Sequence, residues 1–194
     1  IGEIIMGKKP LNQQQVKILR KMLQGRKLHI LLLNIGIDTM LRASDLLKLK
    51  TKDLMHESGE PKTELKVKQK KTGKHTLLMP LSENSRDAIR KYLIDTNADD
   101  YIFIGQLSHL SRKPITVKQY GRIVKGWMKM LGVEDIDQYA SHSIRKIKPT
   151  IIFNQTRNID AVRRLLGQSS VTATSSYIGV TDNSALELAR NINV

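Results

Sequence analysis

Hydrophobic residues recur every three or four positions along most of the chain, which is the spacing of one face of an α-helix. Segment 12–24 has this pattern, and Gly25 follows it in the position where helices commonly end. Segment 27–38 is apolar on nearly all sides, which predicts a helix buried in the centre of the domain. Helices are predicted for segments 12–24, 27–38, 44–50, 82–96, 116–131, 141–154, 159–166 and 184–192.

One segment has a different period. Between residues 64 and 80, Leu65, Val67 and Gln69 alternate with charged residues, and Thr72-Gly73 supplies a turn. This pattern predicts a β-hairpin with one basic face, whereas residues 101–114 are expected to be irregular. The predicted fold class is therefore α+β, mostly α-helical, with a small antiparallel β-sheet or hairpin.

The charge of the chain indicates a polyanionic partner. Its 194 residues suffice for one domain, or for two small ones at most, and we expect one. Lys and Arg total 33 against 18 Asp and Glu, a formal charge of +15 that solubility does not require. A basic protein indifferent to nucleic acids is the alternative. The lysines of the hairpin's basic face are the expected DNA contacts: Lys66, Lys68, Lys70 and Lys74.

Several classes of protein are excluded or disfavoured. The chain has no cysteine, which rules out disulfides, thiolate metal ligands and cysteine catalysis. It has no glycine-rich phosphate loop and no cluster of metal ligands, so we expect no cofactor and no metal. The longest apolar stretch, 30–37, is too short to span a bilayer, so we expect a cytoplasmic protein with no membrane partner. Because the first residue is Ile1, we expect a fragment of a longer protein or a missing start.

A set of polar residues matches the needs of phosphodiester chemistry. Breaking a DNA strand without metal requires a nucleophile, positive charge around the phosphorus and an acid for the leaving oxygen. Tyr177 is the candidate nucleophile, because a tyrosine keeps the bond energy as a phosphotyrosine ester, and its polar surroundings give the phenol little reason to be buried. Arg42 and Arg145 are the candidate phosphate clamp, because a guanidinium donates two parallel hydrogen bonds and stays charged. His142 precedes Arg145 by one helical turn, so it can act as acid or base near the same phosphate.

Each of these residues also has an ordinary interpretation. Tyr177 alone is compatible with a surface or core tyrosine, each arginine with a solvated charge, and His142 with a residue that starts a helix. Asp45, three residues after Arg42, is close enough to orient the arginine or to hold His142, and it can also cap the helix that follows. The order and spacing of the motifs, rather than any single one, favour the catalytic interpretation.

These motifs resemble those of the tyrosine recombinases, also called phage integrases, from about Leu11 to about Val180. Leu41-Arg42-Ala43-Ser44-Asp45-Leu46 is similar to the first arginine box of that family, and His142-Ser143-Ile144-Arg145 to the second. Leu166-Gly167-Gln168 is similar to the third box, and Tyr177 follows nine residues after Gln168. The resemblance implies that a lysine before the turn, here Lys71 in Lys71-Thr72-Gly73, protonates the leaving oxygen and reaches the base beside the cleavage point. Lys70 and Lys74 leave the register of that lysine open.

The chain departs from the family pattern at three positions. Met40 stands where the first box usually has glycine, which alters the backbone before Arg42, and Asp45 replaces glutamate. Gln168 stands where histidine is usual. In the family this position donates a hydrogen bond to the phosphate, and a glutamine amide can donate one, although without charge. The hypothesis is a slower enzyme rather than an inactive one.

The resemblance also implies an architecture and partners. It identifies residues 1–194 as a single catalytic domain, with a tail helix at 181–194 and with any upstream DNA-binding domain absent. The tail helix is expected either to grip a neighbouring protomer or to pack on its own domain. A domain lost from the chain and a naturally minimal protein are both compatible with this pattern. The partners implied are double-stranded DNA and further copies of the chain in a tetrameric synapse, in a bacterial nucleoid or encoded by a phage or mobile element.

Three function classes follow. The leading one is a site-specific recombinase or integrase that cleaves and rejoins DNA through a 3′-phosphotyrosine intermediate. The alternative is a non-cleaving DNA-binding protein that retains the recombinase fold, for which Gln168 and Met40 are the supporting features. A general basic RNA- or DNA-binding protein is the third, and the low number of aromatic residues argues against a base-stacking surface.

Overall fold

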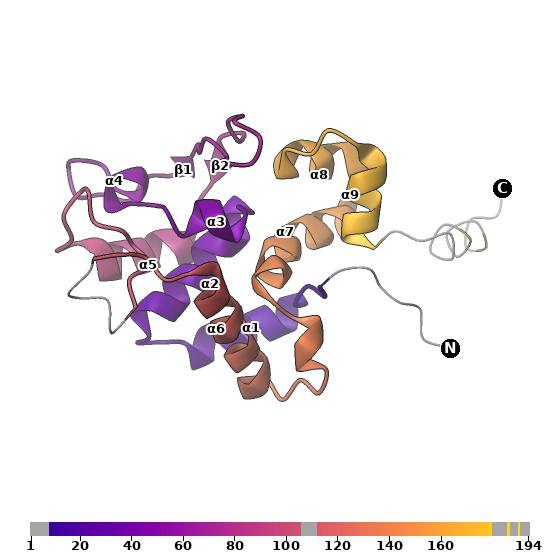
Figure 1. Ribbon diagram of the computed structural model, residues 1–194, viewed down its shortest axis with the longest axis horizontal. Helices are drawn as coiled ribbons and strands as arrows, with labels where there is room; N and C mark the ends of the chain where they lie inside the picture. The colour runs from indigo at the N-terminus through magenta and orange to yellow at the C-terminus, as the bar shows by residue number, and fades with distance from the viewer. Residues whose placement is uncertain (1–7, 106–111, 180–185, 187–189, 191–194) are drawn as a thin grey trace.

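The computed structural model describes residues 8–105 and 112–179, together with Leu186 and Arg190. A mostly helical body carries a small hairpin at its edge, and a pair of short helices lies beside it (Figure 1). The elements in chain order are α1 (Gln13–Met22), α2 (Lys27–Thr39), α3 (Ala43–Leu46), α4 (Thr51–Leu54), β1 (Glu64–Leu65), β2 (Met79–Pro80), α5 (Glu83–Leu93), α6 (Val117–Met130), η2 (Ile136–Gln138), α7 (Ser141–Thr156), α8 (Ile159–Leu166) and α9 (Val171–Ile178). The predicted fold class is confirmed.

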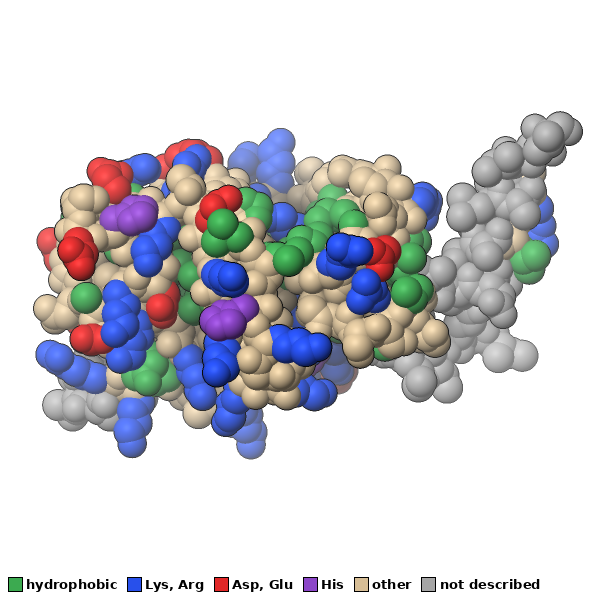
Figure 2. Space-filling view, turned by 90° about the horizontal axis from the view of Figure 1, so that it is seen from above, with side chains coloured by type: hydrophobic (Ala, Val, Ile, Leu, Met, Phe, Trp, Pro, Cys, Tyr) green, Lys and Arg blue, Asp and Glu red, His purple; other side chains and the backbone are tan. Residues whose placement is uncertain are grey.

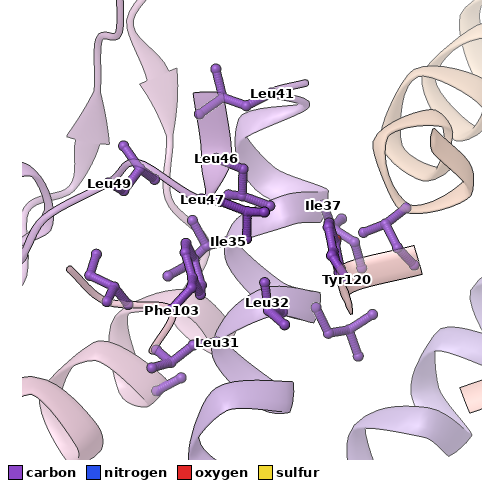
Figure 3. Packing of buried hydrophobic residues seen from close by; sticks show 14 of the residues in the cluster. Leu31, Leu32, Ile35, Ile37, Leu41, Leu46, Leu47, Leu49, Phe103 and Tyr120 are labelled. Carbon is purple, nitrogen blue, oxygen red and sulfur yellow. The ribbon is translucent and has the colours of Figure 1, made fainter. Parts of the chain in front are cut away.

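Helix α2 is the centre of the main core, as its apolar sequence predicts. It packs against α5 and α7, and its leucines and isoleucines from Leu31 to Ile37 are fully or nearly fully buried. Figure 3 shows its side chains facing Phe103 and Tyr120. Gly36 allows α7 to come close, because a Cβ there would lie 3.1 Å from Ile144 and 3.2 Å from the Tyr120 hydroxyl. The close packing of α2 and α7 matters for function, because Arg42 follows α2 and Arg145 lies on α7.

A second, smaller hydrophobic core lies under α8 and α9, which we call the tyrosine lobe. Met40, Met79, Val162 and Leu166 form this core, and Tyr177 packs against it. Met40 comes from the end of α2 and Met79 from β2, so two side chains of the main body reach into the lobe. In Figure 1 the lobe lies at the end of α7, beside the body. The position of Tyr177 relative to the arginines therefore depends on this small core.

The predicted hairpin is present. Glu64 pairs with Pro80 and Leu65 with Met79 in antiparallel register, and Lys68 pairs with His75 nearer the turn. The alternation is also as predicted: Leu65 and Gln69 are buried, whereas the lysines between and beyond them are exposed. The hairpin therefore presents a basic outer face and buries two polar residues, Gln69 and Thr76.

One predicted helix differs from the structure. Segment 44–50 is not one helix but the end of α3 followed by a turn, and α4 begins after it at Thr51. The chain turns here because the backbone N–H groups of Thr51 and Lys52 bond to the carbonyls of Asp100 and Ala98 on a neighbouring segment. The predicted helix 184–192 lies outside the described residues, apart from Leu186 and Arg190.

Helix α9 had not been predicted. Its sequence contains no strongly hydrophobic face and is rich in serine and threonine, which compete for backbone hydrogen bonds within helices. Ser170 caps the helix by accepting a hydrogen bond from the N–H of Ala173, and α9 packs on α8 and α7. Tertiary packing thus makes helical a segment whose local sequence is weakly helical.

A buried carboxylate ties three helices together. Asp38, near the end of α2, accepts hydrogen bonds through Oδ2 from the backbone N–H of Ser82 at 2.8 Å and from the hydroxyls of Ser82 and Ser85 at 2.6 Å each. Lys148 of α7 lies 3.3 Å from its Oδ1. Because Asp38 is almost fully buried, this network fixes the start of α5 and the side of α7 relative to α2.

No helix in the described ranges is both long enough and apolar enough to cross a lipid bilayer.

Candidate active site

The first arginine follows a backbone reversal at the end of α2. Met40 adopts the left-handed conformation, with φ 50° and ψ 26°, and its N–H bonds to the carbonyl of Gly36. This conformation is rare for residues other than glycine, and it turns the chain so that Arg42 leaves the helix axis. Met40 therefore has a backbone conformation that glycine adopts without strain, and it adds a side chain that packs in the core of the tyrosine lobe.

Gln69 holds the side chain of Arg42. Nη1 of Arg42 donates a hydrogen bond to Oε1 of Gln69 at 2.5 Å, and the Thr72 hydroxyl lies 3.4 Å from the same oxygen. Gln69 also touches the tyrosine lobe, because a Cβ on Gly167 would lie 3.0 Å from its Nε2. Gly167 has φ 64°, so glycine at this position satisfies both the backbone and the lack of space. Gln69 is thus the point where the hairpin, Arg42 and the tyrosine lobe meet.

The second arginine lies close to the tyrosine. Nη2 of the buried Arg145 donates to the carbonyl of Leu166 at 3.0 Å, which ties α7 to the end of α8. The guanidinium carbon of Arg145 lies 5.8 Å from the centre of the Tyr177 ring. Burial lowers the pKa of Arg145, while the nearby Tyr177 and Asp45 act to raise it. The structure therefore brings Arg145 and Tyr177 into one site.

Tyr177 differs from one expectation. We had expected its polar surroundings to leave the phenol accessible, but its hydroxyl is buried and has no hydrogen-bond partner among the described residues. The reason is that α9 packs the ring against the small core and against α7. Burial raises the pKa of Tyr177, and the positive charges of Arg145 and Arg42 act in the opposite direction.

His142 is in the same electrostatic environment. It begins α7 together with Ser141, one turn before Arg145, as the spacing predicts. Partial burial lowers its pKa below the ordinary value, and the charges of Arg145, Lys146 and Arg42 lower it further. Its imidazole is therefore neutral at neutral pH and becomes easier to protonate when an anion offsets these three charges.

Gln168 lies at the start of the α8–α9 connection. Its Oε1 accepts a hydrogen bond from the buried hydroxyl of Thr174 at 2.7 Å, and its carbonyl accepts one from Nη1 of Arg163 at 3.1 Å. The bond from Thr174 fixes the side chain with its amide oxygen toward α9. Among the described residues no hydrogen bond occupies its Nε2, which leaves an amide donor for a ligand.

Asp45 has a role that the sequence did not predict. The cap interpretation is wrong, because α3 has no side-chain cap and Asp45 lies inside it. Instead, Oδ1 accepts a hydrogen bond from the backbone N–H of Lys70 at 3.0 Å, which anchors the turn of the hairpin. The other oxygen, Oδ2, is buried with no partner among the described residues. Asp45 positions the hairpin turn near Arg42, and its negative charge acts to raise the pKa of Arg145.

Lys71 lies at the tip of the hairpin turn and is exposed. The structure does not bring its ammonium group into hydrogen-bonding contact with the arginines or Tyr177, so the choice among Lys70, Lys71 and Lys74 stays a prediction. Both anchors of the turn, Gln69 to Arg42 and Lys70 to Asp45, hold this segment beside the site.

The basic face of the hairpin borders a hollow of about 260 Å³. Lys66, Lys68 and Lys70 line it together with Asp45 and Asp53, and Lys48, which the sequence did not single out, contributes from the turn after α3. Figure 2, which views the molecule from above, shows Lys and Arg side chains spread across this face. The expected DNA-contacting lysines are therefore exposed and stand next to the candidate active site.

Sequence reasoning missed two further residues of the site. Gln69 had a signal, since it is a polar residue at an inward position of an alternating strand. Lys146 also had one, because it follows His142 by four residues and therefore shares a helical face with His142 and Arg145. Lys146 is almost fully buried, and its Nζ lies 4.7 Å from the centre of the Tyr177 ring. Within the described ranges no group of three or more His, Cys, Asp or Glu side chains is arranged to hold a metal ion.

Comparisons with known proteins agree with this geometry. The model of the phage integrase family matches residues 9–184. The chain is 30% identical over 170 residues to the probable integrase/recombinase YoeC of Bacillus subtilis, covering 88% of this chain and 86% of that protein. It is 27% identical to the tyrosine recombinase XerA of Pyrococcus furiosus, covering 96% of this chain and 62% of XerA.

A solved structure has the same fold. The XerH site-specific recombinase, bound to a palindromic difH substrate in a post-cleavage complex, matches with a TM-score of 0.72 and 20% identity, covering 95% of this chain and 53% of that one. The chain thus spans most of YoeC but less than two thirds of XerA and of the XerH chain. Family match, relatives and fold together establish that the chain belongs to the phage integrase family of tyrosine recombinases and has the fold of their catalytic domain.

Proposed function

We propose that this chain is the catalytic part of a site-specific DNA recombinase that breaks and rejoins strands through Tyr177. The phenolic oxygen attacks the scissile phosphorus and loses its proton, and the bond from phosphorus to the 5′ oxygen breaks. The leaving oxygen takes a proton from an acid of the site, so the products are a 3′-phosphotyrosine ester and a free 5′ hydroxyl. Attack of a 5′ hydroxyl from a partner strand reverses the chemistry and joins the strands without metal or nucleotide.

The observation that carries this proposal is the set of unpartnered polar atoms around Tyr177. Buried polar atoms nearly always have a hydrogen-bond partner, yet both the Tyr177 hydroxyl and Nε of Arg145 lack one in the described structure. A phosphate bound at this point would accept a bond from Nε of Arg145 and place its phosphorus near the hydroxyl. Support also comes from Arg42, whose positive charge acts to lower the pKa of both Tyr177 and Arg145.

The other residues have complementary roles in the proposal. Arg42 and Arg145 clamp the non-bridging oxygens and stabilise the charge that grows in the transition state. His142 and the hairpin lysine, for which we choose Lys71, are the candidate acids and bases. Gln168 donates from its amide Nε2, a weaker bond than a charged donor would provide, so cleavage is expected to be slower than with histidine there.

Double-stranded DNA is the proposed substrate. The net charge of +15 favours a polyanion, and the structurally similar XerH was solved on its difH substrate. Because each strand exchange joins ends from two duplexes, we propose that several copies assemble on DNA, as a tetrameric synapse, in the cytoplasm of the host. Family and relatives disfavour the alternative of a non-cleaving DNA-binding protein, and a general RNA-binding function has no support from them.

A covalent trap tests the proposal. The chain is incubated with a nicked suicide duplex that carries the cognate site found in flanking genomic DNA, and an adduct that survives SDS is scored. We expect an adduct with the natural chain and none with Tyr177→Phe, while both bind the duplex equally. Absence of an adduct on a duplex that is demonstrably bound, with no rescue by Gln168→His, would contradict the proposal.

A further inference from the structure

Lys146 is a buried cation that has no acidic partner in the part of the chain that the structure describes. It follows Arg145 on α7 and lies one turn after His142, because residues four apart are neighbours on a helix. Only 5% of its surface is exposed. Among the described residues it forms no salt bridge and no side-chain hydrogen bond. Lysine is almost never buried in this way unless another group offsets its charge.

The group that Lys146 faces is the ring of Tyr177. Its Nζ lies 4.7 Å from the ring centre, closer than the guanidinium carbon of Arg145 at 5.8 Å. A cation at this distance is attracted to the face of an aromatic ring, and the attraction is stronger where water is excluded. The attraction increases further when the phenol becomes a phenolate, because negative charge then spreads into the ring.

A bound phosphate would offset the charge of the two arginines more than the charge of Lys146. Arg42 and Arg145 are the proposed phosphate ligands, so the bound phosphate offsets much of their charge at the moment when Tyr177 must lose its proton. The ammonium of Lys146 lies over the Tyr177 ring, so its charge stays beside the phenol when phosphate occupies the arginines. The site needs such a cation, because burial raises the pKa of Tyr177.

The charged groups around Tyr177 are consistent with separate roles for Lys146 and for the two arginines. Arg145 and Lys146 face it from α7, and Arg42 acts on it from the chain after α2. Helix α9 itself contains no charged residue, and on α8 the carboxylate of Asp160 is paired with Arg163 and Arg164. The carboxylate of Asp45 acts to raise the pKa of Arg145.

We propose that Lys146 is a positioning residue of the strand-cleavage step, which holds the ring of Tyr177 against α7 and stabilises its phenolate. This inference rests on the function proposed above. Lys146 neither gives nor takes a proton in this scheme: the phenolic proton passes to a base of the site, the Oη–P bond forms as the bond from phosphorus to the 5′ oxygen breaks, and that oxygen is protonated by an acid of the site.

The test compares Lys146→Met and Lys146→Arg with the natural chain. Single-turnover cleavage of the suicide duplex is measured across pH, and the tyrosinate absorbance of the free protein is titrated with and without Tyr177→Phe to isolate the signal of Tyr177. Lys118→Met, which removes an exposed lysine from α6, is the matched control.

We expect Lys146→Met to move both the pH midpoint of cleavage and the titration of Tyr177 upward, by about one pH unit, and to slow cleavage below the midpoint about tenfold. Lys146→Arg keeps the cation and should restore most of the shift, and Lys118→Met should leave both midpoints unchanged. If Lys146→Met lowers the cleavage rate equally at every pH and leaves the titration of Tyr177 in place, Lys146 only supports the fold and the proposal is wrong.

Two controls separate the possible failures. If Lys146→Met does not fold, Lys146→Gln and Lys146→Arg carry the same comparison, and a Tyr177 titration that is identical in both overturns the proposal. If the natural chain forms no adduct, the function proposed above fails. The titration without DNA still decides whether Lys146 stabilises the phenolate.

Discussion

Met40 offers the sharpest test of how the two parts of the site are joined. Its backbone has the left-handed conformation, which disfavours a residue with a side chain by about 1–2 kcal/mol. Its side chain is only 3% exposed and packs with Met79, Val162 and Leu166 under the tyrosine lobe. Replacing a buried methionine by a small residue costs about 2–5 kcal/mol. The lost packing therefore outweighs the relieved backbone strain.

Two variants separate these effects. Met40→Ala loses the packing and keeps the strain, so its free energy of unfolding should fall by about 2–5 kcal/mol. Met40→Gly loses the same packing but relieves the strain, so it should be more stable than Met40→Ala by about 1 kcal/mol and still less stable than the natural chain. Urea unfolding followed by circular dichroism measures all three. If Met40→Gly equals or exceeds the natural chain in stability, the packing argument is wrong; if Met40→Ala is the more stable variant, the strain argument is wrong.

Three more predictions concern neighbouring residues. Asp38→Asn should lower the free energy of unfolding by about 3–5 kcal/mol in thermal or urea unfolding, because it leaves the partly buried Lys148 without its carboxylate, and an unchanged stability would refute the network. The pKa of His142 is lowered by burial and by three cations, so phosphate binding should raise it. DNA affinity should therefore increase as pH falls below neutral, by up to about tenfold more in the natural chain than in His142→Gln. Equal pH dependence in titrations of both proteins would contradict this. Gln168→His should cleave the suicide duplex faster than the natural chain, since it restores a charged donor, and slower cleavage would show that the Thr174 contact matters more.

The regular parts of the fold were predictable from local pattern. Helix α2 follows from its continuous apolar sequence, and the hairpin follows from the alternation of Leu65, Val67 and Gln69, because side-chain burial in helices and strands repeats with their periods. Helix α9 was not predictable in this way, since only Thr174 is buried in it and its stability comes from α7 and α8.

Only those site residues that belong to spaced sequence motifs were predictable from the sequence. His142 and Arg145 come together because they are one helical turn apart, and the structure places Arg42 and Tyr177 beside them. The contact of Gln69 with Arg42 and the burial of Lys146 under the Tyr177 ring join segments far apart in the sequence. The alternative role of Asp45 as a helix cap was wrong, because its carboxylate accepts a hydrogen bond from the hairpin turn instead.

The most direct measurement is the chemical identity of the protein–DNA linkage. The trapped adduct is digested with protease and nuclease, and the peptide that carries nucleotide is identified by mass spectrometry. The proposed mechanism predicts a single modified peptide, with the 3′ phosphate of the cleaved strand joined to the oxygen of Tyr177. A linkage to another residue, or to the 5′ phosphate, would contradict it.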